Sequence, residues 1–206
     1  MKTKKTLLII FAIMCLFTLS CESYKPLEFK NYGSCDGYKI GDTGPADGII
    51  FYDKGSVSDG WRYLEVAPAS SEFNAQWGAY EKNVTGTQTG IGTGKSNTDK
   101  IVAFLNSAGN IESKRAAQLC VALNIGGKKD WFLPSRDELN LMYVNLHQKG
   151  LGDFGKGTNS ESWMNWYYWS SSQSSNSIAR HQNFYDGSQY LTIKDSTSRV
   201  RAVRAF

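Results

Sequence analysis

The stretch from Thr89 to Ser96 places glycines, a lysine and a hydroxyl group much as a phosphate-binding loop does. It reads Thr89-Gly-Ile-Gly-Thr-Gly-Lys-Ser96, and such a loop holds phosphate on its backbone N–H groups while the lysine reaches the terminal phosphate. The pattern requires glycine at the position of Thr89 and a hydrophobic strand just upstream, where the chain has Asn83-Val-Thr-Gly86. We therefore expect a glycine-rich turn that caps the next helix, not a nucleotide site.

Histidine and serine, which act as base and nucleophile in hydrolytic enzymes, occur without the partners that such sites need. His147 falls at the end of a predicted helix, where a cation near the terminal carbonyl groups is favourable. His181 follows Arg180 in a polar stretch that we interpret as a strand. The serines 170–172 have no base that the sequence identifies. We predict no catalytic residue, no metal site and no cofactor, and a protein that is not an enzyme.

Residues 154–190 combine aromatic rings with Ser, Asn, Gln and Tyr side chains, a composition typical of binding loops. Aromatic faces stack on sugar rings or peptide side chains, and the polar groups add hydrogen bonds at little entropic cost. An alternative stays open for each tryptophan, because aromatic residues of late strands also fill the core of a small sheet. The predicted ligand-binding residues are Trp163, Trp166, Tyr167, Asn176, Arg180, His181, Asn183, Tyr185, Asp186 and Tyr190.

The N-terminal residues have the pattern of a secretory signal. Three lysines precede an apolar run from Leu7 to Leu19, which is too short for a membrane span. The sequence Leu16-Phe-Thr-Leu-Ser-Cys21 resembles the lipobox of bacterial lipoproteins, in which cleavage leaves an acylated cysteine. Plain secretion and an uncleaved anchor are the alternatives.

We therefore expect a signal peptide over residues 1–20, a tether over 21–37 with lipid on Cys21, and a domain over 38–206. The predicted location is the cell envelope, outside the cytoplasm, with the lipid holding the protein to a membrane at the outer surface or the periplasmic face.

Charge and cysteine content limit the partners. Loss of residues 1–20 removes three of the 23 basic residues and no acidic residue, which leaves 20 against 19. A chain so nearly neutral gives no reason to expect nucleic acid as a partner. Cys35 and Cys120 would remain besides Cys21, and in an oxidising compartment they either form a disulfide or stay as two separate thiols.

The elements that would position these residues begin with a hairpin. Short strands are predicted at Ile49–Tyr52 and Trp61–Ala67, joined by a loop of about eight residues. Residues 70–96 contain five glycines and lack periodicity, so a long surface loop is predicted there.

Three helices are predicted. The first begins at Asn97 or Thr98 and runs to Ala108, and the second covers residues 113–123. The third is the best marked: residues 131–133 form an extended run that ends at a proline, and Ser135 with Glu138 then forms a capping box.

Four late strands are predicted, at Trp169–Ser172, Ile178–Phe184, Gln189–Ile193 and Arg199–Phe206. The last one alternates but changes phase near Ala202, which predicts a bulge or a paired, partly buried arginine. We expect this terminal strand to lie beside Ile49–Tyr52.

Three motifs together resemble one bacterial family. Trp131-Phe-Leu-Pro-Ser-Arg-Asp-Glu-Leu139, Tyr168-Trp-Ser-Ser-Ser172 and Val200-Arg-Ala-Val-Arg-Ala-Phe206 are similar to signatures of the family named for the C-terminal domain of the Legionella collagen-like adhesin. Gly41-Asp-Thr-Gly-Pro-Ala46 and Gly92-Thr-Gly-Lys95 are also similar to its members. The resemblance covers about residues 38–206.

The family is similar in turn to the formylglycine-generating enzyme fold and to variable ligand-binding proteins diversified by retroelements. The resemblance therefore implies an α+β, C-type lectin-like fold, with short antiparallel strands, two to three helices packed on them, and paired N- and C-terminal strands. Calcium-dependent lectins of this fold use a carboxylate-amide-proline loop and a Trp-Asn-Asp strand. Neither occurs here, although Trp163-Met-Asn165 is faintly similar to the second.

The resemblance implies function only as an expectation, because one fold hosts many functions. The adhesin is understood to bind sulfated glycans, which Arg199, Arg201 and Arg204 would suit as a basic stripe, but pairing with framework carboxylates is the favoured interpretation. We expect adhesin-like binding of a host or environmental glycan or protein. The alternatives are a structural envelope protein and, disfavoured because no cysteine follows Cys120, an enzyme of the formylglycine-generating type.

Overall fold

The computed structural model describes residues 37–155 and 166–206. Gly37–Phe206 forms one compact unit. The predicted signal peptide, nearly all of the tether with Cys21 and Cys35, and the predicted binding residue Trp163 lie outside the described residues.

A three-stranded sheet joins the two ends of this unit. It contains β1 (Ile49–Ser58), β2 (Trp61–Val66) and β8 (Val203–Ala205) in the order β1-β2-β8. The β1–β2 turn is only two residues, Asp59 and Gly60, both with positive φ, as tight hairpins require. The prediction of an eight-residue loop was wrong because β1 continues to Ser58.

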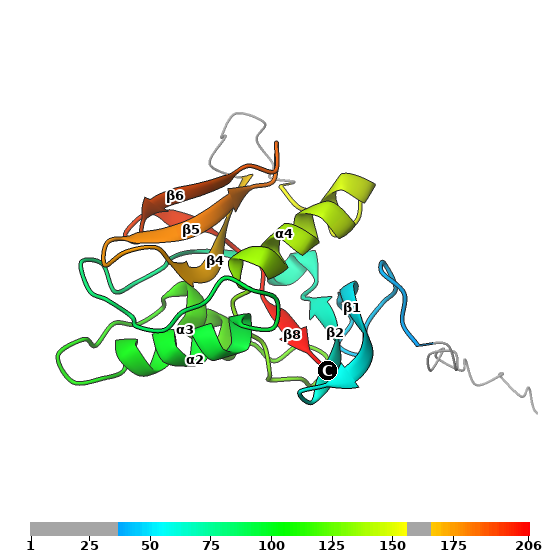
Figure 1. The fold of residues 1–206 in the computed structure, drawn as a ribbon, viewed down its shortest axis with the longest axis horizontal. Coiled ribbons are helices and arrows are strands. Elements are labelled where there is room, and N and C mark those ends of the chain that lie inside the picture. Colours follow the sequence, from blue (N-terminus) through cyan, green and yellow to red (C-terminus); the bar gives the residue numbers. More distant parts are fainter. Residues whose placement is uncertain (1–36, 156–165) are drawn as a thin grey trace, which may run out of the picture. The chain divides into compact units, whose positions relative to one another are not determined.

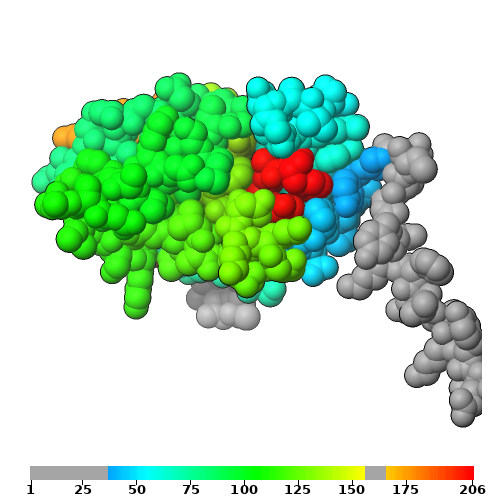
Figure 2. All heavy atoms as spheres, turned by 90° about the horizontal axis from the view of Figure 1, so that it is seen from below, coloured from blue at the N-terminus to red at the C-terminus, as the bar shows by residue number. Residues whose placement is uncertain are grey.

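The terminal strand does not pair as predicted. We expected it beside Ile49–Tyr52, but β8 pairs with β2, with Leu64 opposite Ala205 and Glu65 opposite Arg204. The outer edge of β1 is already occupied, because Ile50 exchanges backbone hydrogen bonds with Gly41 and Asp42. Figure 2 shows the C-terminal residues in red against the cyan hairpin.

A five-stranded sheet carries most of the late sequence. Its order is β3-β7-β4-β5-β6, and all neighbours are antiparallel except β4 and β7. The strands are β3 (Phe73–Gln76), β4 (Tyr167–Gln173), β5 (Ile178–Asn183), β6 (Gln189–Ile193) and β7 (Thr197–Val200). Strand β3 and a 3-10 turn at Ala69–Ser71 correct the prediction of an unstructured loop over 70–96.

Three helices pack on these sheets, α2 (Gly94–Leu105), α3 (Ala116–Val121) and α4 (Arg136–Asn145), and a 3-10 turn (His147–Lys149) follows α4 (Figure 1). The predicted capping box is confirmed: Ser135 accepts a hydrogen bond from the Glu138 backbone, and Glu138 accepts one from the Ser135 backbone. The stretch 131–133 is not a full strand, and only Phe132 pairs, with Val203.

The core has two parts. One lies where α2 and α3 meet the five-stranded sheet and contains Trp77, Trp131 and Trp169. The other lies under α4 and takes side chains from both sheets, including Phe51 and Tyr168. Tyr168 and Trp169, near the start of β4, are thus core residues. This agrees with the alternative prediction that aromatic residues of the late strands fill the core.

The late arginines are internal. Glu72 pairs with both Arg199 and Arg201, while Arg204 binds Glu65 at 3.0 Å and Asp130 at 2.9 Å. The favoured interpretation, pairing with framework carboxylates, is confirmed, and the phase change at residues 201–202 is a break between β7 and β8. The described part of the chain is an α+β domain with these arginines as internal ties.

Candidate functional site

Three of the predicted binding residues lie together on one face of the five-stranded sheet. His181 on β5 is the cross-strand partner of Tyr190 on β6, and it stacks on Tyr167 of β4 with ring centroids 4.6 Å apart. The Tyr190 ring lies 5.8 Å from that of Tyr167. Because side chains alternate along a strand, these three residues of three neighbouring strands share a face.

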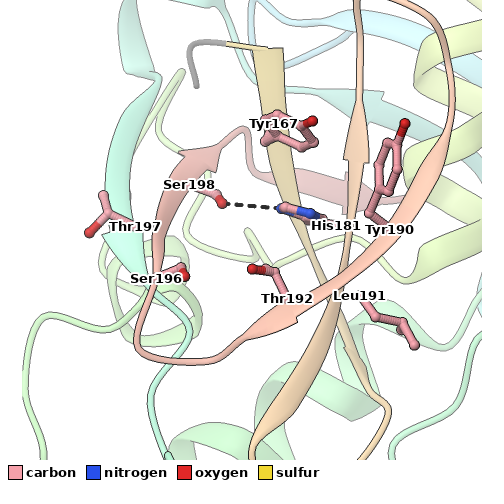
Figure 3. Close-up of a pocket in the computed structure, with 8 residues that line it drawn as sticks. All are labelled: Tyr167, His181, Tyr190, Leu191, Thr192, Ser196, Thr197 and Ser198. Carbon is pink, nitrogen blue, oxygen red and sulfur yellow. Dashed lines mark hydrogen bonds between the residues drawn. The ribbon is translucent and has the colours of Figure 1, made fainter. Parts of the chain in front are cut away.

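The three rings line an open cavity of about 270 Å³. The rest of its wall comes from β6, the turn that follows it and the start of β7 (Figure 3). The additional lining residues are Leu191, Thr192, Ser196, Thr197 and Ser198. Ser198 points at the His181 ring, with 3.4 Å between Ser198 Oγ and His181 Nδ1.

The described lining of the cavity is uncharged. Among residues 37–155 and 166–206, no Asp, Glu, Lys or Arg lines it. Burial lowers the pKa of His181 to about 4, so the imidazole is neutral above that pH. A neutral imidazole has one N–H donor and one acceptor nitrogen. The site therefore offers aromatic surface and hydrogen-bonding groups, not a field for a charged ligand.

Three more predicted residues, Asn183, Tyr185 and Asp186, lie at the turn between β5 and β6, and a fourth, Trp166, precedes β4 and contacts that turn. Tyr185 is 75% exposed and contacts Trp166 edge-on at 5.8 Å. Asn183 and Asp186 use their carboxyl or amide oxygens within the turn, accepting from the backbones of Tyr185 and Ser188, each at 2.8 Å. This group does not line the cavity.

The remaining two described residues are placed elsewhere. Arg180 sits between Ala179 and His181 on β5, so its side chain leaves the opposite face of the sheet. Asn176 is exposed in the turn from β4 to β5. The sequence thus identified aromatic members of the cavity but grouped them with residues that strand pairing separates.

The hydroxyl-bearing residues that line the cavity were not predicted from the sequence. Thr192, Ser196, Thr197 and Ser198 come from a short polar stretch that ends one strand and begins the next. The only signal was the run Ser196-Thr-Ser198, which is also typical of an ordinary turn.

A second cavity of about 460 Å³ lies between the β1–β2 turn and the start of α2. Trp61, Lys95 and Asp130 are among its lining residues. Its charged groups are largely engaged, because Lys95 pairs with Asp99 at 2.6 Å and Asp130 with Arg204 at 2.9 Å. It is therefore the weaker candidate.

The glycine-rich turn does hold an anion, but an internal one. Glu138 accepts hydrogen bonds from the backbone N–H groups of Gly92 at 2.8 Å and Ser135 at 2.7 Å, and a longer one from Gly94 at 3.3 Å. Burial raises the pKa of the Glu138 carboxyl above its ordinary value, although these hydrogen bonds oppose the shift. The amides that resemble a phosphate loop are occupied by this side chain.

Three further features concern the cysteines, possible metal ligands and membrane-spanning helices. Cys120 is a buried free thiol, and burial raises its pKa, but Cys35 lies outside the described residues, so the predicted disulfide stays a prediction. Within residues 37–155 and 166–206, no three His, Cys, Asp or Glu side chains are grouped as metal ligands. In the same part of the chain, no helix has the length and hydrophobicity to cross a membrane.

The fold and the cavity define a class: an α+β domain whose two sheets are tied by internal arginines and whose late strands carry an open aromatic and hydroxyl face. The model of the Lcl C-terminal domain family matches residues 74–204, and the chain belongs to this family, an adhesin-like domain. The match begins within β3 and leaves out the β1–β2 hairpin, although the compact unit includes it. No curated protein matches the sequence.

Proposed function

We propose that this domain binds an extracellular ligand, a glycan or a protein, through the face formed by Tyr167, His181 and Tyr190. The observation that carries the proposal is the convergence of three rings from three strands on one open, hydroxyl-lined cavity. Small-molecule sites combine apolar surface with a few placed polar groups in this way. Membership of an adhesin-like family supports a binding role.

The proposed setting is the cell envelope. The lysines and apolar run of residues 1–20 and the lipobox-like Cys21 support export and attachment by an N-terminal lipid. We further propose that the fold is C-type lectin-like, which the early hairpin, the late strands and the closure of β8 on that hairpin support. No catalysis is proposed.

A structural envelope role is the second candidate, and strand β6 favours it. This strand pairs only with β5 among the described residues, and Leu191 and Ile193 on it are 55% and 47% exposed. Exposed apolar residues on an open strand edge suit assembly with another protein. In that case one abundant envelope protein would crosslink to β6, and soluble ligands would not bind.

The binding role is tested with two tyrosine variants. The purified full chain is applied to arrays of extracellular glycans and matrix proteins, together with Tyr190→Ala and Tyr185→Ala. Tyr190 lines the cavity whereas Tyr185 does not, and both lie on the surface of the same hairpin. We expect Tyr190→Ala to abolish binding and Tyr185→Ala to retain it, with melting temperatures unchanged. An array without bound ligand, or equal loss in both variants, contradicts the proposal.

A further inference from the structure

Resting on the binding function proposed above, we infer that the cavity accommodates one uncharged pyranose ring of a glycan, stacked on Tyr190 and hydrogen-bonded by the hydroxyl groups around it. The size of the cavity, its hydroxyl groups, its aromatic walls and its uncharged described lining support this class of ligand.

Size limits the ligand to a small unit. The cavity measures about 270 Å³, just under the range of about 300–1,000 Å³ that sites for drug-sized molecules occupy. A single six-membered ring with its substituents suits that volume. The cavity is also open, so the rest of a longer glycan can continue into solvent.

The free hydroxyl groups favour a sugar over an apolar side chain. Among the described residues, the hydroxyls of Tyr190, Thr192 and Ser196 make no hydrogen bond, and all three residues line the same cavity as His181 (Figure 3). A hydroxyl group both donates and accepts, as sugar hydroxyls do. An apolar peptide side chain would bury these groups without partners, at a cost of about 1–3 kcal/mol each.

The aromatic walls differ in their roles. Tyr167 and His181 stack on each other, which fixes the floor of the cavity. Tyr190 approaches both edge-on, with interplanar angles of 64° and 82°, and stays 42% exposed. Part of its ring is therefore available to the C–H groups on one face of a pyranose.

The charge distribution disfavours an anionic ligand. No charged side chain of the described residues lines the cavity, Arg180 points from the opposite face, and Arg199 on the adjoining strand β7 is paired with Glu72. Because His181 has a pKa of about 4, it adds no positive charge at neutral pH. Recognition of sulfate or carboxylate groups would need a cation, which the described residues of this face do not supply.

The test uses methyl glycosides of glucose, galactose, mannose and N-acetylglucosamine as neutral probes, and heparin as the anionic probe. Binding to the full chain is measured by saturation-transfer NMR at about 0.05 and 0.5 M NaCl, across which charge-based binding weakens steeply. We expect at least one neutral glycoside to bind equally at both salt concentrations. Tyr190→Ala should weaken it about tenfold and Tyr190→Phe less, because the ring is retained. Tyr185→Ala is the matched control and should leave the affinity unchanged.

The outcomes separate this inference from the function on which it rests. If a ligand from the arrays binds through Tyr190 but no neutral glycoside binds or competes, the binding function stands and the pyranose assignment is wrong. Salt-sensitive binding of heparin alone also overturns the assignment. If neither arrays nor glycosides show Tyr190-dependent binding, both proposals fail.

Discussion

His181 is a histidine whose surroundings favour the neutral imidazole. Its ring is held between Tyr167 and Trp169, with centroids 4.6 and 5.5 Å away, and burial is the cause of its lowered pKa. A carboxylate neighbour would have the opposite effect and hold the charge in place. The residue is therefore a weakly polar part of an aromatic floor across the neutral pH range.

The lowered pKa of His181 predicts a pH-dependent stability. Between its ordinary pKa of 6.5 and the folded value of about 4, the unfolded chain binds more protons than the folded one. The free energy of unfolding should thus fall as pH drops from 6.5 to 4, and His181→Gln should reduce that fall. Urea unfolding of both proteins at pH 7.5 and 4.5 measures the difference, since all other groups are shared. Identical losses in the two proteins would show that His181 is not the source.

Lys194 is a second buried group with an unusual environment. Its ammonium group donates to the carbonyl oxygens of Lys82 at 2.8 Å and Ala79 at 3.3 Å and to Gln173 Oε1 at 2.7 Å, and it lies 4.7 Å from the Trp77 ring centroid. Burial lowers the pKa of Lys194 to about 8. The lysine therefore joins the segment after β3 to the ends of β4 and β6.

Replacement of this lysine tests its role as a tie. Lys194→Met keeps the side-chain length but removes the ammonium donor from all three acceptors. The Lys82 carbonyl loses its donor, while the Ala79 carbonyl and Gln173 Oε1 keep one each, from the backbones of Lys82 and Val84. We expect a loss of about 1–3 kcal/mol in the free energy of unfolding. Chemical denaturation measures it, and Lys149→Met, at an exposed position, is the control. Equal free energies of unfolding in the two variants would mean that water satisfies the acceptors of Lys194 as well as its ammonium group does.

At the scale of elements, the glycine-rich turn and helix α4 form one unit. Glu138 belongs to the first turn of α4 and its carboxylate reaches the turn that leads into α2. Thr89 contributes a further bond, because its carbonyl accepts from the backbone of Asp137 at 3.0 Å. Two helix starts are thereby held together by one acidic side chain.

Glu138→Gln is expected to loosen both helix starts. The glutamine side chain keeps the shape of glutamate but has one acceptor oxygen where the carboxylate has two. One or more of the backbone N–H groups bound to Glu138 should lose its acceptor, so the free energy of unfolding should fall by about 1–3 kcal/mol. Gly92 and Gly94 donate to Oε1 and Ser135 donates to Oε2, so hydrogen exchange should accelerate at whichever of these amides faces the new NH2 group, along with the loss seen by denaturation. Glu81→Gln, at an exposed position, serves as the control. Unchanged exchange at all three amides, those of Gly92, Gly94 and Ser135, would contradict this account.

Local signals predicted some elements well. The capping box, the bounds of β6 and the start of β5 were readable because each depends on neighbouring residues. Strand β3 was not, since the alternation in Phe73-Asn-Ala-Gln76 spans only four residues and the strand forms by pairing with β7. The partner of β8 could not be predicted from local sequence either, because residues 41–42 already hydrogen-bond to the free edge of β1. The candidate site was half predicted for the same reason: ring types are local, but their grouping follows strand pairing.

At the scale of the whole compact unit, Arg204 connects parts that are distant in sequence. It joins Glu65 on β2 to Asp130 before α4, and the Glu65 carboxylate also accepts from the backbones of Ala46 and Gly48 at 3.0 and 2.8 Å. Glu65 is fully buried. The C-terminal strand therefore supplies the charge that makes a buried carboxylate tolerable.

Removal of that charge should be costly. Arg204→Met leaves Glu65 buried without its cation, for which we expect a loss of about 3–5 kcal/mol in the free energy of unfolding. Arg136→Met removes a pair at the surface, with Asp137, and should cost about 0–1 kcal/mol. Urea denaturation of both variants at pH 7 provides the comparison. Similar small losses in the two would show that Glu65 is stabilised by its backbone donors alone.

The acidic side chain in the glycine-rich turn has one more consequence. Since Glu138 is attached to the same chain, its concentration beside those amides is set by the fold and not by what the surroundings contain. A phosphate ion arriving from solution would have to displace an anion that cannot diffuse away. In this protein, the backbone amides of a loop that resembles a nucleotide-binding loop are therefore occupied by Glu138 whenever the domain is folded.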